Sequence, residues 1–121
     1  MFLKSLLFCL ALYASGACAG DPWDTTDKWL GAATFTALAV DWGQTRYIAK
    51  HPEKFYETNF ILGEHPSVGR VDAYYATVGI GTFLMADYLG GRDRKWFLGA
   101  VLALELAYAI HNQRLGIKVE F

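Results

Sequence analysis

Three apolar stretches, separated by short polar segments, dominate the pattern of hydrophobic and polar positions along the chain. They run from about residue 28 to 49, from about 70 to 90 and from about 95 to 113. The first has no charge between positions 29 and 40 and is apolar nearly all round a helical projection, which is typical of a helix in lipid. Twenty helical residues span roughly 30 Å, the thickness of a bilayer core. The pattern predicts an all-α fold, a three-helix transmembrane bundle.

A targeting segment precedes these stretches. Lys4 supplies a positive charge, residues 6–13 form an apolar run, and Ala17-Cys18-Ala19 has the small residues of a leader cleavage site. We expect a signal peptide of residues 1–19, followed by a single membrane domain of residues 20–121. Cleavage after Ala19 removes both cysteines, so the mature domain has no thiol for disulfides, metal binding or nucleophilic catalysis. Lipid attachment at Cys18 and an uncleaved anchor are the alternatives.

Composition and charge exclude several classes of function. Of the 121 residues, 54% are hydrophobic and 19% are charged, and the formal net charge is −1. This balance lacks the basic surface field of a nucleic-acid-binding protein, so we expect no nucleic-acid partner. Neither GxGxxG nor GxxxxGK[ST] occurs, so no phosphate-binding loop is visible. We assign no cofactor and no metal to the chain.

Small residues recur every four positions on two of the expected helices. Such spacing places them on one helix face. Faces lined by small residues let a second helix approach closely, so we expect contact with the lipid bilayer and, at these stripes, a homo-oligomer or a membrane-protein partner. The stripes consist of Ala33, Ala37, Asp41 and Thr45 in the first helix and of Gly99, Ala103 and Ala107 in the third.

Positive charges predict an orientation in a bacterial inner membrane. A secretory signal places residue 20 on the periplasmic side, and three spans then place the C-terminus in the cytoplasm. Lys and Arg residues are enriched on the cytoplasmic side of such proteins. The chain has six on that side and four on the other. The six are Arg46, Lys50, Lys54, Arg70, Arg114 and Lys118, and the four are Lys28, Arg92, Arg94 and Lys95.

The segment between the first two helices, residues 51–69, is too apolar for a freely solvated linker. His51-Pro52 and His65-Pro66 bracket it, and a residue before proline disfavours helix. We expect the segment to lie against the membrane surface or to fold back over the helix ends.

Polar residues from all three helices and this loop fall in one half of the expected bundle. Intramembrane ionisable residues are costly and mark functional sites or paired networks. A shared site could bind a cation, transfer a proton or act as acid and base. A hydrogen-bond network that fixes helix register explains the same residues, and we favour it. The candidate cluster is Asp41, Gln44, Thr45, Glu57, Asn59, Asp72, Glu105, His111 and Asn112.

A short motif carries a family resemblance. Asp41-x-x-x-Thr45 on a membrane helix, followed by Glu57-x-Asn59 in the next loop, resembles a pattern of small bacterial membrane proteins, the DUF5658-like group. The loop motif of that group is similar to Glu-x-Asn-Pro, and Phe60 stands at the proline position here. The surrounding sequence also looks like hypothetical proteins of bacterial and phage genomes. The resemblance covers the middle third of the chain, implies a polytopic membrane protein and brings no known activity.

These patterns favour a structural, interaction or modulator subunit of the inner membrane with a buried polar clasp. They assign no catalytic residue and favour a protein that is not an enzyme. Three alternatives remain open. One is a transport component in which Asp41, Glu105 and His111 handle a proton or cation. Another is an intramembrane enzyme that uses Asp41, Glu57 and His111. The last is a secreted soluble helical domain, because the uninterrupted apolar runs are short.

Overall fold

The computed structural model describes residues 20–121 and shows three helices and no strand in that range. The helices are α2 (Thr25–Lys50), α3 (Val68–Leu89) and α4 (Gly91–Arg114). The expected all-α fold with three helices is confirmed. The expected signal peptide, residues 1–19, lies outside the described residues.

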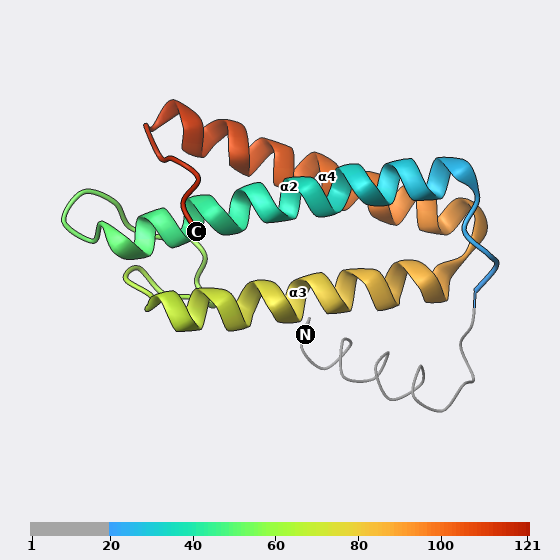
Figure 1. Ribbon diagram of the computed structural model, residues 1–121, viewed down its shortest axis with the longest axis horizontal. Helices are drawn as coiled ribbons and strands as arrows, with labels where there is room; N and C mark the ends of the chain where they lie inside the picture. The colour runs from blue at the N-terminus through green and yellow to red at the C-terminus, as the bar shows by residue number, and fades with distance from the viewer. Residues whose placement is uncertain (1–19) are drawn as a thin grey trace.

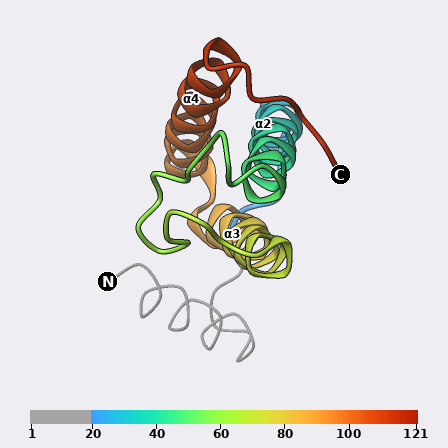
Figure 2. The same ribbon diagram turned by 90° about the vertical axis from the view of Figure 1, so that its left-hand side faces the viewer.

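The helices form an up-down-up bundle in which α3 runs antiparallel to α2 and α4 (Figure 1). Figure 2 views the bundle along its length, with the three helices at the corners of a triangle and the loop between α2 and α3 crossing one end. At the other end lie the residues before α2 and the turn between α3 and α4. The two ends carry separate clusters of polar side chains.

Capping side chains fix the starts of α2 and α3. Asp24 accepts a hydrogen bond from the Asp27 backbone N–H (2.8 Å), and the Asp27 carboxylate accepts one from the Asp24 N–H (3.0 Å). This reciprocal capping box satisfies N–H groups that have no partner within the helix, and α2 therefore begins at Thr25, three residues before the expected position. Ser67 caps α3 by accepting from the Arg70 N–H (3.1 Å).

A single residue, Gly90, separates α3 from α4. Its φ of 66° lies in the left-handed region, where glycine carries no steric penalty. The Arg94 N–H donates to the Gly90 carbonyl (3.1 Å), so helical hydrogen bonding begins directly after the turn. The sequence pattern placed the start of the third helix at residue 95. The helix in fact begins at Gly91 and includes the charged residues that we had assigned to the turn.

The bundle buries polar side chains together with apolar ones and exposes large apolar side chains. Four of the six largest fully buried side chains are polar or charged: Arg94, Thr34, Thr45 and Asp27. Large hydrophobic side chains on all three helices are exposed. Among the helices that the structure describes, none combines the length and the apolar character needed to cross a bilayer.

The C-terminal residues fold back onto α2. The Glu120 N–H donates to the Gly43 carbonyl (3.1 Å), and the Phe121 ring meets the Trp42 ring edge-on at 5.3 Å between centroids. Gly43 makes this approach possible, because a Cβ there would lie 2.5 Å from Val119 Cγ1. The sequence pattern does not predict this attachment of the tail to α2.

Candidate functional site

Asp41, Tyr75 and Thr45 form a buried chain of hydrogen bonds between α2 and α3. The Tyr75 hydroxyl donates to Asp41 Oδ2 (2.6 Å), and Thr45 Oγ1 lies 3.0 Å from the same hydroxyl. Because the Tyr75 proton points to Asp41, the Thr45 hydroxyl donates to the Tyr75 oxygen. Positions 41 and 45 are one helical turn apart, which places both side chains on the face of α2 that meets α3.

Helix α4 is connected to these hydrogen-bonded residues through two amide side chains, Asn112 of α4 and Gln44 of α2. Asn112 Nδ2 lies 3.4 Å from Asp41 Oδ1 and 3.2 Å from Gln44 Oε1. Gln44 Nε2 in turn donates to the backbone carbonyl of Ala109 (3.1 Å). These contacts connect α2 to the last turns of α4 through neutral hydrogen bonds.

Glu105 places a second carboxyl group beside Asp41. Glu105 is 9% exposed, and its side chain hydrogen-bonds to that of Asp41. A hydrogen bond between two carboxyl groups requires a proton on one of them, because a carboxylate only accepts. Glu105 Oε2 is buried without a hydrogen-bond partner in the protein. We call the following residues the polar core: Asp41, Gln44, Thr45, Tyr75, Glu105 and Asn112.

The loop motif attaches to the polar core through Tyr74. The Glu57 carboxylate accepts from the Asn59 N–H (3.0 Å), and Asn59 Oδ1 accepts from the Ile61 N–H (3.0 Å). Asn59 Nδ2 donates to the Tyr74 hydroxyl (2.9 Å), and the Tyr74 ring packs edge-on against the Tyr75 ring. The loop is thus held to α3 at the edge of the polar core.

The environment of Glu57 favours its neutral form. Burial raises the pKa of Glu57 above its usual value, the hydrogen bond from the Asn59 N–H lowers it, and the nearby charge of Asp41 raises it again. The net direction is upward. Glu57 is therefore a third carboxyl group beside Asp41 and Glu105, and its pKa depends on the charge of Asp41.

Two members of the expected cluster lie elsewhere. Asp72 binds Arg46 Nη1 with both carboxylate oxygens (2.5 and 2.6 Å) and accepts from Trp42 Nε1 (2.8 Å). This pair is partly exposed and separate from the polar core, and it joins Arg46 of α2 to Asp72 of α3. His111 is exposed on α4. The other seven are either in the polar core or, for Glu57 and Asn59, joined to it through Tyr74.

A second cluster, at the opposite end of the bundle, was not foreseen. Arg94 is fully buried and donates to the Asp27 carboxylate (2.9 Å), the Ala86 carbonyl (2.7 Å) and the Asp21 carbonyl (2.6 Å). Its guanidinium lies over the Trp23 ring, 4.9 Å from the centroid. We call this cluster the N-terminal clasp. Its side chains are Trp23, Asp24, Asp27, Asp87, Arg94 and Lys95.

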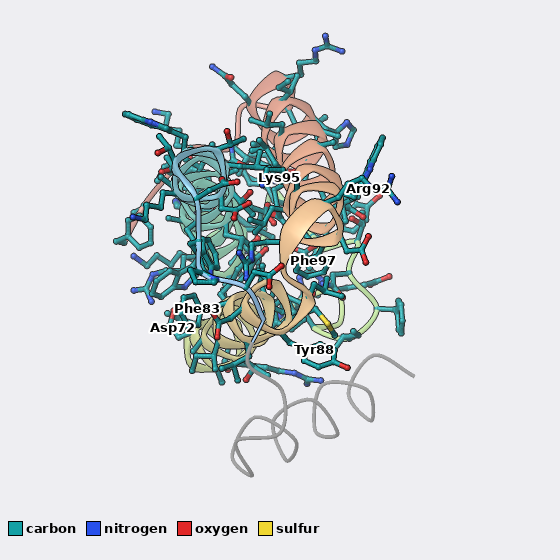
Figure 3. The ribbon with its side chains drawn as sticks, turned by 90° about the vertical axis from the view of Figure 1, so that its right-hand side faces the viewer. Asp72, Phe83, Tyr88, Arg92, Lys95 and Phe97 are labelled. Carbon is teal, nitrogen blue, oxygen red and sulfur yellow. The ribbon has the colours of Figure 1, made fainter. Side chains whose placement is uncertain are left out.

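Lys95 and Trp23 complete the N-terminal clasp. Lys95 Nζ lies 2.8 Å from a carboxylate oxygen of Asp24 and of Asp27. Trp23 Nε1 donates to Asp87 Oδ1 (2.8 Å). Figure 3 views this end of the molecule and shows Lys95 on the side of α4 toward α2, with Arg92 on the opposite side. The signal in the sequence was the pair of acids at the start of the first helix and the pair of bases at the start of the third.

These contacts keep Asp27 ionised. Burial acts to raise the pKa of Asp27, but hydrogen bonds from Lys95, the Asp24 backbone and Arg94 outweigh it and lower the pKa to about 2. A buried carboxylate with two cationic partners is stabilised in its charged form. The N-terminal clasp is therefore an ion-pair network, whereas the polar core is built of neutral donors around two carboxyl groups.

An apolar groove of about 540 Å³ runs between α2 and α4. Ala33 and Ala37 of the expected first stripe line it, whereas Gly99, Ala103 and Ala107 of the second do not. No polar-core residue opens into it. Within residues 20–121, no three His, Cys, Asp or Glu side chains are grouped so that they could hold a metal ion.

No protein-family model, no curated protein and no solved structure matches the chain. What the protein does is therefore argued from its own geometry. The two features that any function must explain are the buried polar core and the apolar exterior that surrounds it.

Proposed function

We propose that the protein is a small integral protein of the bacterial inner membrane, a structural or interaction subunit whose polar core fixes the register of three spanning helices. The observation that carries this proposal is that polar side chains are buried between the helices while large apolar side chains are exposed on them. Soluble domains bury large apolar residues and expose charges, and contiguous apolar surface marks contact with lipid or protein.

The exposed side of the helices matches a lipid environment. Large hydrophobic side chains on all three helices are between 41% and 75% exposed. In a bilayer these side chains meet acyl chains, and polar side chains turn toward the bundle interior and pair with one another. The exposed helical residues are Trp29, Ile80, Phe83, Tyr88, Trp96, Leu104, Leu106, Tyr108 and Ile110.

Inward-facing polar residues contribute to the low average hydropathy of α2. The helices contain 26, 22 and 24 residues, which corresponds to roughly 33–39 Å at 1.5 Å per residue. The polar residues of α2 that lower its average, such as Thr34, Asp41 and Thr45, are buried within the bundle and do not face its surroundings. An average over all positions counts them equally with the lipid-facing ones.

Aromatic and charged residues support the expected orientation, with residue 20 periplasmic and the C-terminus cytoplasmic. Trp29 and Trp96 are highly exposed near one end of the bundle, and Phe60 is 93% exposed at the other. Aromatic side chains are enriched at both membrane interfaces. Two of the four cations on the proposed periplasmic side, Arg94 and Lys95, are engaged by carboxylates.

Membrane extraction tests this proposal. We expect the chain to stay with the membrane fraction after carbonate washing and to require detergent for release. A cysteine introduced at Phe60 should react with a membrane-impermeant maleimide only after the cytoplasmic side is opened, and one at Arg92 in intact cells whose outer membrane has been permeabilised. Release into the supernatant by carbonate contradicts the membrane assignment, and the reverse labelling pattern contradicts the orientation.

The interaction role uses the groove between α2 and α4, and the occupant that we propose is a second copy of the chain. The groove is bordered by Leu106, and Ile110 extends the same ridge of α4 one turn further. A groove beside an exposed ridge is self-complementary under two-fold symmetry. Ala33→Trp should abolish cross-linked dimers, and Ala76→Trp on the exposed face of α3 should not. Unchanged cross-linking in the first variant excludes this contact.

A proton-handling role is the second candidate, and the Asp41–Glu105 pair favours it. Two carboxyl groups that share one proton can release it, and the free oxygen Glu105 Oε2 can accept another hydrogen bond. In proteoliposomes, this role predicts proton flux that is lost in Glu105→Gln. If the wild-type protein shows no proton flux, the proton-handling role is excluded and the structural role is favoured.

A further inference from the structure

Gly20 is seated against the C-terminal end of α3. Its backbone N–H donates to the Asp87 carbonyl (3.1 Å). A Cβ at Gly20 would lie 2.2 Å from that carbonyl oxygen and 2.9 Å from the carbonyl oxygen of Tyr88. No side chain fits at either distance, so the position requires glycine because of close approach to the backbone of α3.

The residues after Gly20 are held in place as well. Arg94 donates to the carbonyl of Asp21 (2.6 Å), and Trp23 stacks on Phe83 and donates to Asp87. Gly20, Asp21 and Trp23 are thus all bound to α3 or α4. In the sequence, the small-residue site Ala17-Cys18-Ala19 ends directly before Gly20.

The surroundings of the Gly20 nitrogen favour a positive charge. Five carboxyl groups lie at this end of the bundle, those of Asp21, Asp24, Asp27, Asp87 and Asp93, together with four basic side chains, those of Lys28, Arg92, Arg94 and Lys95. The last carbonyls of a helix carry the negative end of its dipole. Arg94 Nη2 shares the Asp87 carbonyl (3.2 Å) and opposes a further cation, but the acids outnumber the bases.

We propose that the chain is cut between Ala19 and Gly20 and that the released α-ammonium of Gly20 binds the carbonyl groups at the end of α3. A leader peptidase adds water to the Ala19–Gly20 peptide bond. The carbonyl carbon of Ala19 gains the hydroxyl and leaves as a carboxylate, and the Gly20 nitrogen gains the proton. Free α-amino groups have pKa values of about 7.7–8.0, so this nitrogen is an ammonium at neutral pH. The cut therefore supplies a cation that completes the N-terminal clasp.

The intact mass of the protein tests the position of the cut. The full chain with a C-terminal tag is expressed in a bacterial host and purified in detergent. We expect a mass that begins at Gly20. A mass that retains residues 1–19, a mass that begins at another residue, or a diacylglyceryl group on Cys18 each overturns the proposal. None of these outcomes depends on the number of membrane spans.

Acetylation tests the role of the charge. The processed chain with a free Gly20 amine is compared with the same chain acetylated at Gly20, which keeps an N–H donor and removes the positive charge. We expect acetylation to lower the midpoint of thermal unfolding at pH 7 by about 4–8 °C, the shift that a change near 1 kcal/mol produces in a domain of about 100 residues. Equal midpoints overturn the binding of the ammonium even where the cut is correct.

A glycine substitution tests the seat itself. Gly20→Ala should lower the unfolding midpoint, because the new Cβ displaces the backbone from Asp87 and Tyr88. Gly79→Ala on α3 is the matched control, since no atom lies within 4 Å of a Cβ there and alanine favours helix. The control should unfold at the same temperature as the parent chain or above it. If the Gly20→Ala chain is as stable as the control, the close contact of Gly20 with the end of α3 is contradicted.

Discussion

At the scale of single residues, Arg94 should have the largest effect on stability. It is fully buried and donates to the Asp27 carboxylate and to four backbone carbonyls. Arg94→Met leaves Asp27 buried with only Lys95 as a cationic partner, and breaking a buried pair costs about 3–5 kcal/mol. We expect a loss of that size in equilibrium unfolding in detergent. Arg92→Met, at an exposed position of the same turn, should change stability by less than about 0.5 kcal/mol.

Asp27 should make the stability of the bundle acid-sensitive. Its pKa is lowered from 3.8 to about 2 in the folded state, so the folded state favours the carboxylate. The resulting stabilisation is complete above the unfolded pKa and is lost as the pH falls from about 4 to 2. Unfolding midpoints measured across that range should fall for the parent chain and fall less steeply for Asp27→Asn. Parallel curves for the two chains would contradict the ion-paired state of Asp27.

Which residues could be foreseen depended on the sequence distance of their partners. The cap at Asp24 was predictable, because its partner Asp27 lies three residues away. Tyr75 and Arg94 were missed, because their partners Asp41 and Asp27 lie 34 and 67 positions away and nothing in the local pattern pairs them. Asp72 was expected in the cluster, but it pairs with Arg46 instead. The position of a residue along a helix predicts how deep it lies in the bundle, but it does not predict which neighbouring helix its side chain faces.

At the scale of elements, the loop between α2 and α3 should depend on Asn59. Its side chain accepts from the Ile61 N–H and donates to Tyr74, so Asn59→Ala removes both contacts at once. We expect a loss of about 1–3 kcal/mol in local stability and faster amide exchange at Ile61, with little change in the helices. Thr58→Ala, on the exposed neighbouring residue, is the control. Exchange at Ile61 that stays at the parent rate would show that the loop is held by other contacts.

The helices themselves were predictable from the hydropathy pattern, but their ends were not. All three observed helices begin before the expected positions, at Thr25, Val68 and Gly91. The first turn of a helix often consists of charged and capping residues, and its apolar residues begin only after them. A pattern of apolar positions alone therefore places the start of the helix too late. Arg94, four residues after the one-residue turn at Gly90, is buried and donates to the Ala86 carbonyl before the turn, a contact that the local run of charges did not predict.

At the scale of the whole molecule, the sequence predicted the number of helices and a polar cluster between them. The returning tail could not be foreseen, because the approach of Val119 to Gly43 depends on a glycine whose neighbours lie at the far end of the chain. The second cluster was concealed for a related reason. Charges near a helix end are typical of a solvated turn, and only the packing of α2 against α4 converts them into a buried network.

The Asp41–Glu105 pair distinguishes a structural polar core from one that carries protons. If the core is structural, Asp41→Asn should fold normally, because an amide can still accept from Tyr75 and donate to Glu105. Asp41→Leu should be strongly destabilised, since it removes the acceptor of the Tyr75 hydroxyl and the partner of the buried Glu105 side chain, at about 1–3 kcal/mol for each group. The double cycle of Asp41→Asn with Glu105→Gln should give a coupling of about 0.5–2 kcal/mol in thermal or denaturant unfolding.

The same variants also test the chemical alternative. A core that only holds helices together should keep its function in Asp41→Asn and Glu105→Gln, because both amides keep the shape of the acids and one acceptor oxygen, and their NH2 group can donate in place of the shared proton. A stably folded Glu105→Gln protein that has lost activity would contradict the structural role and favour proton transfer. Since both variants preserve side-chain volume and replace one titratable oxygen by an NH2 group that cannot release a proton, the comparison separates proton transfer from packing where the two carboxyl groups meet.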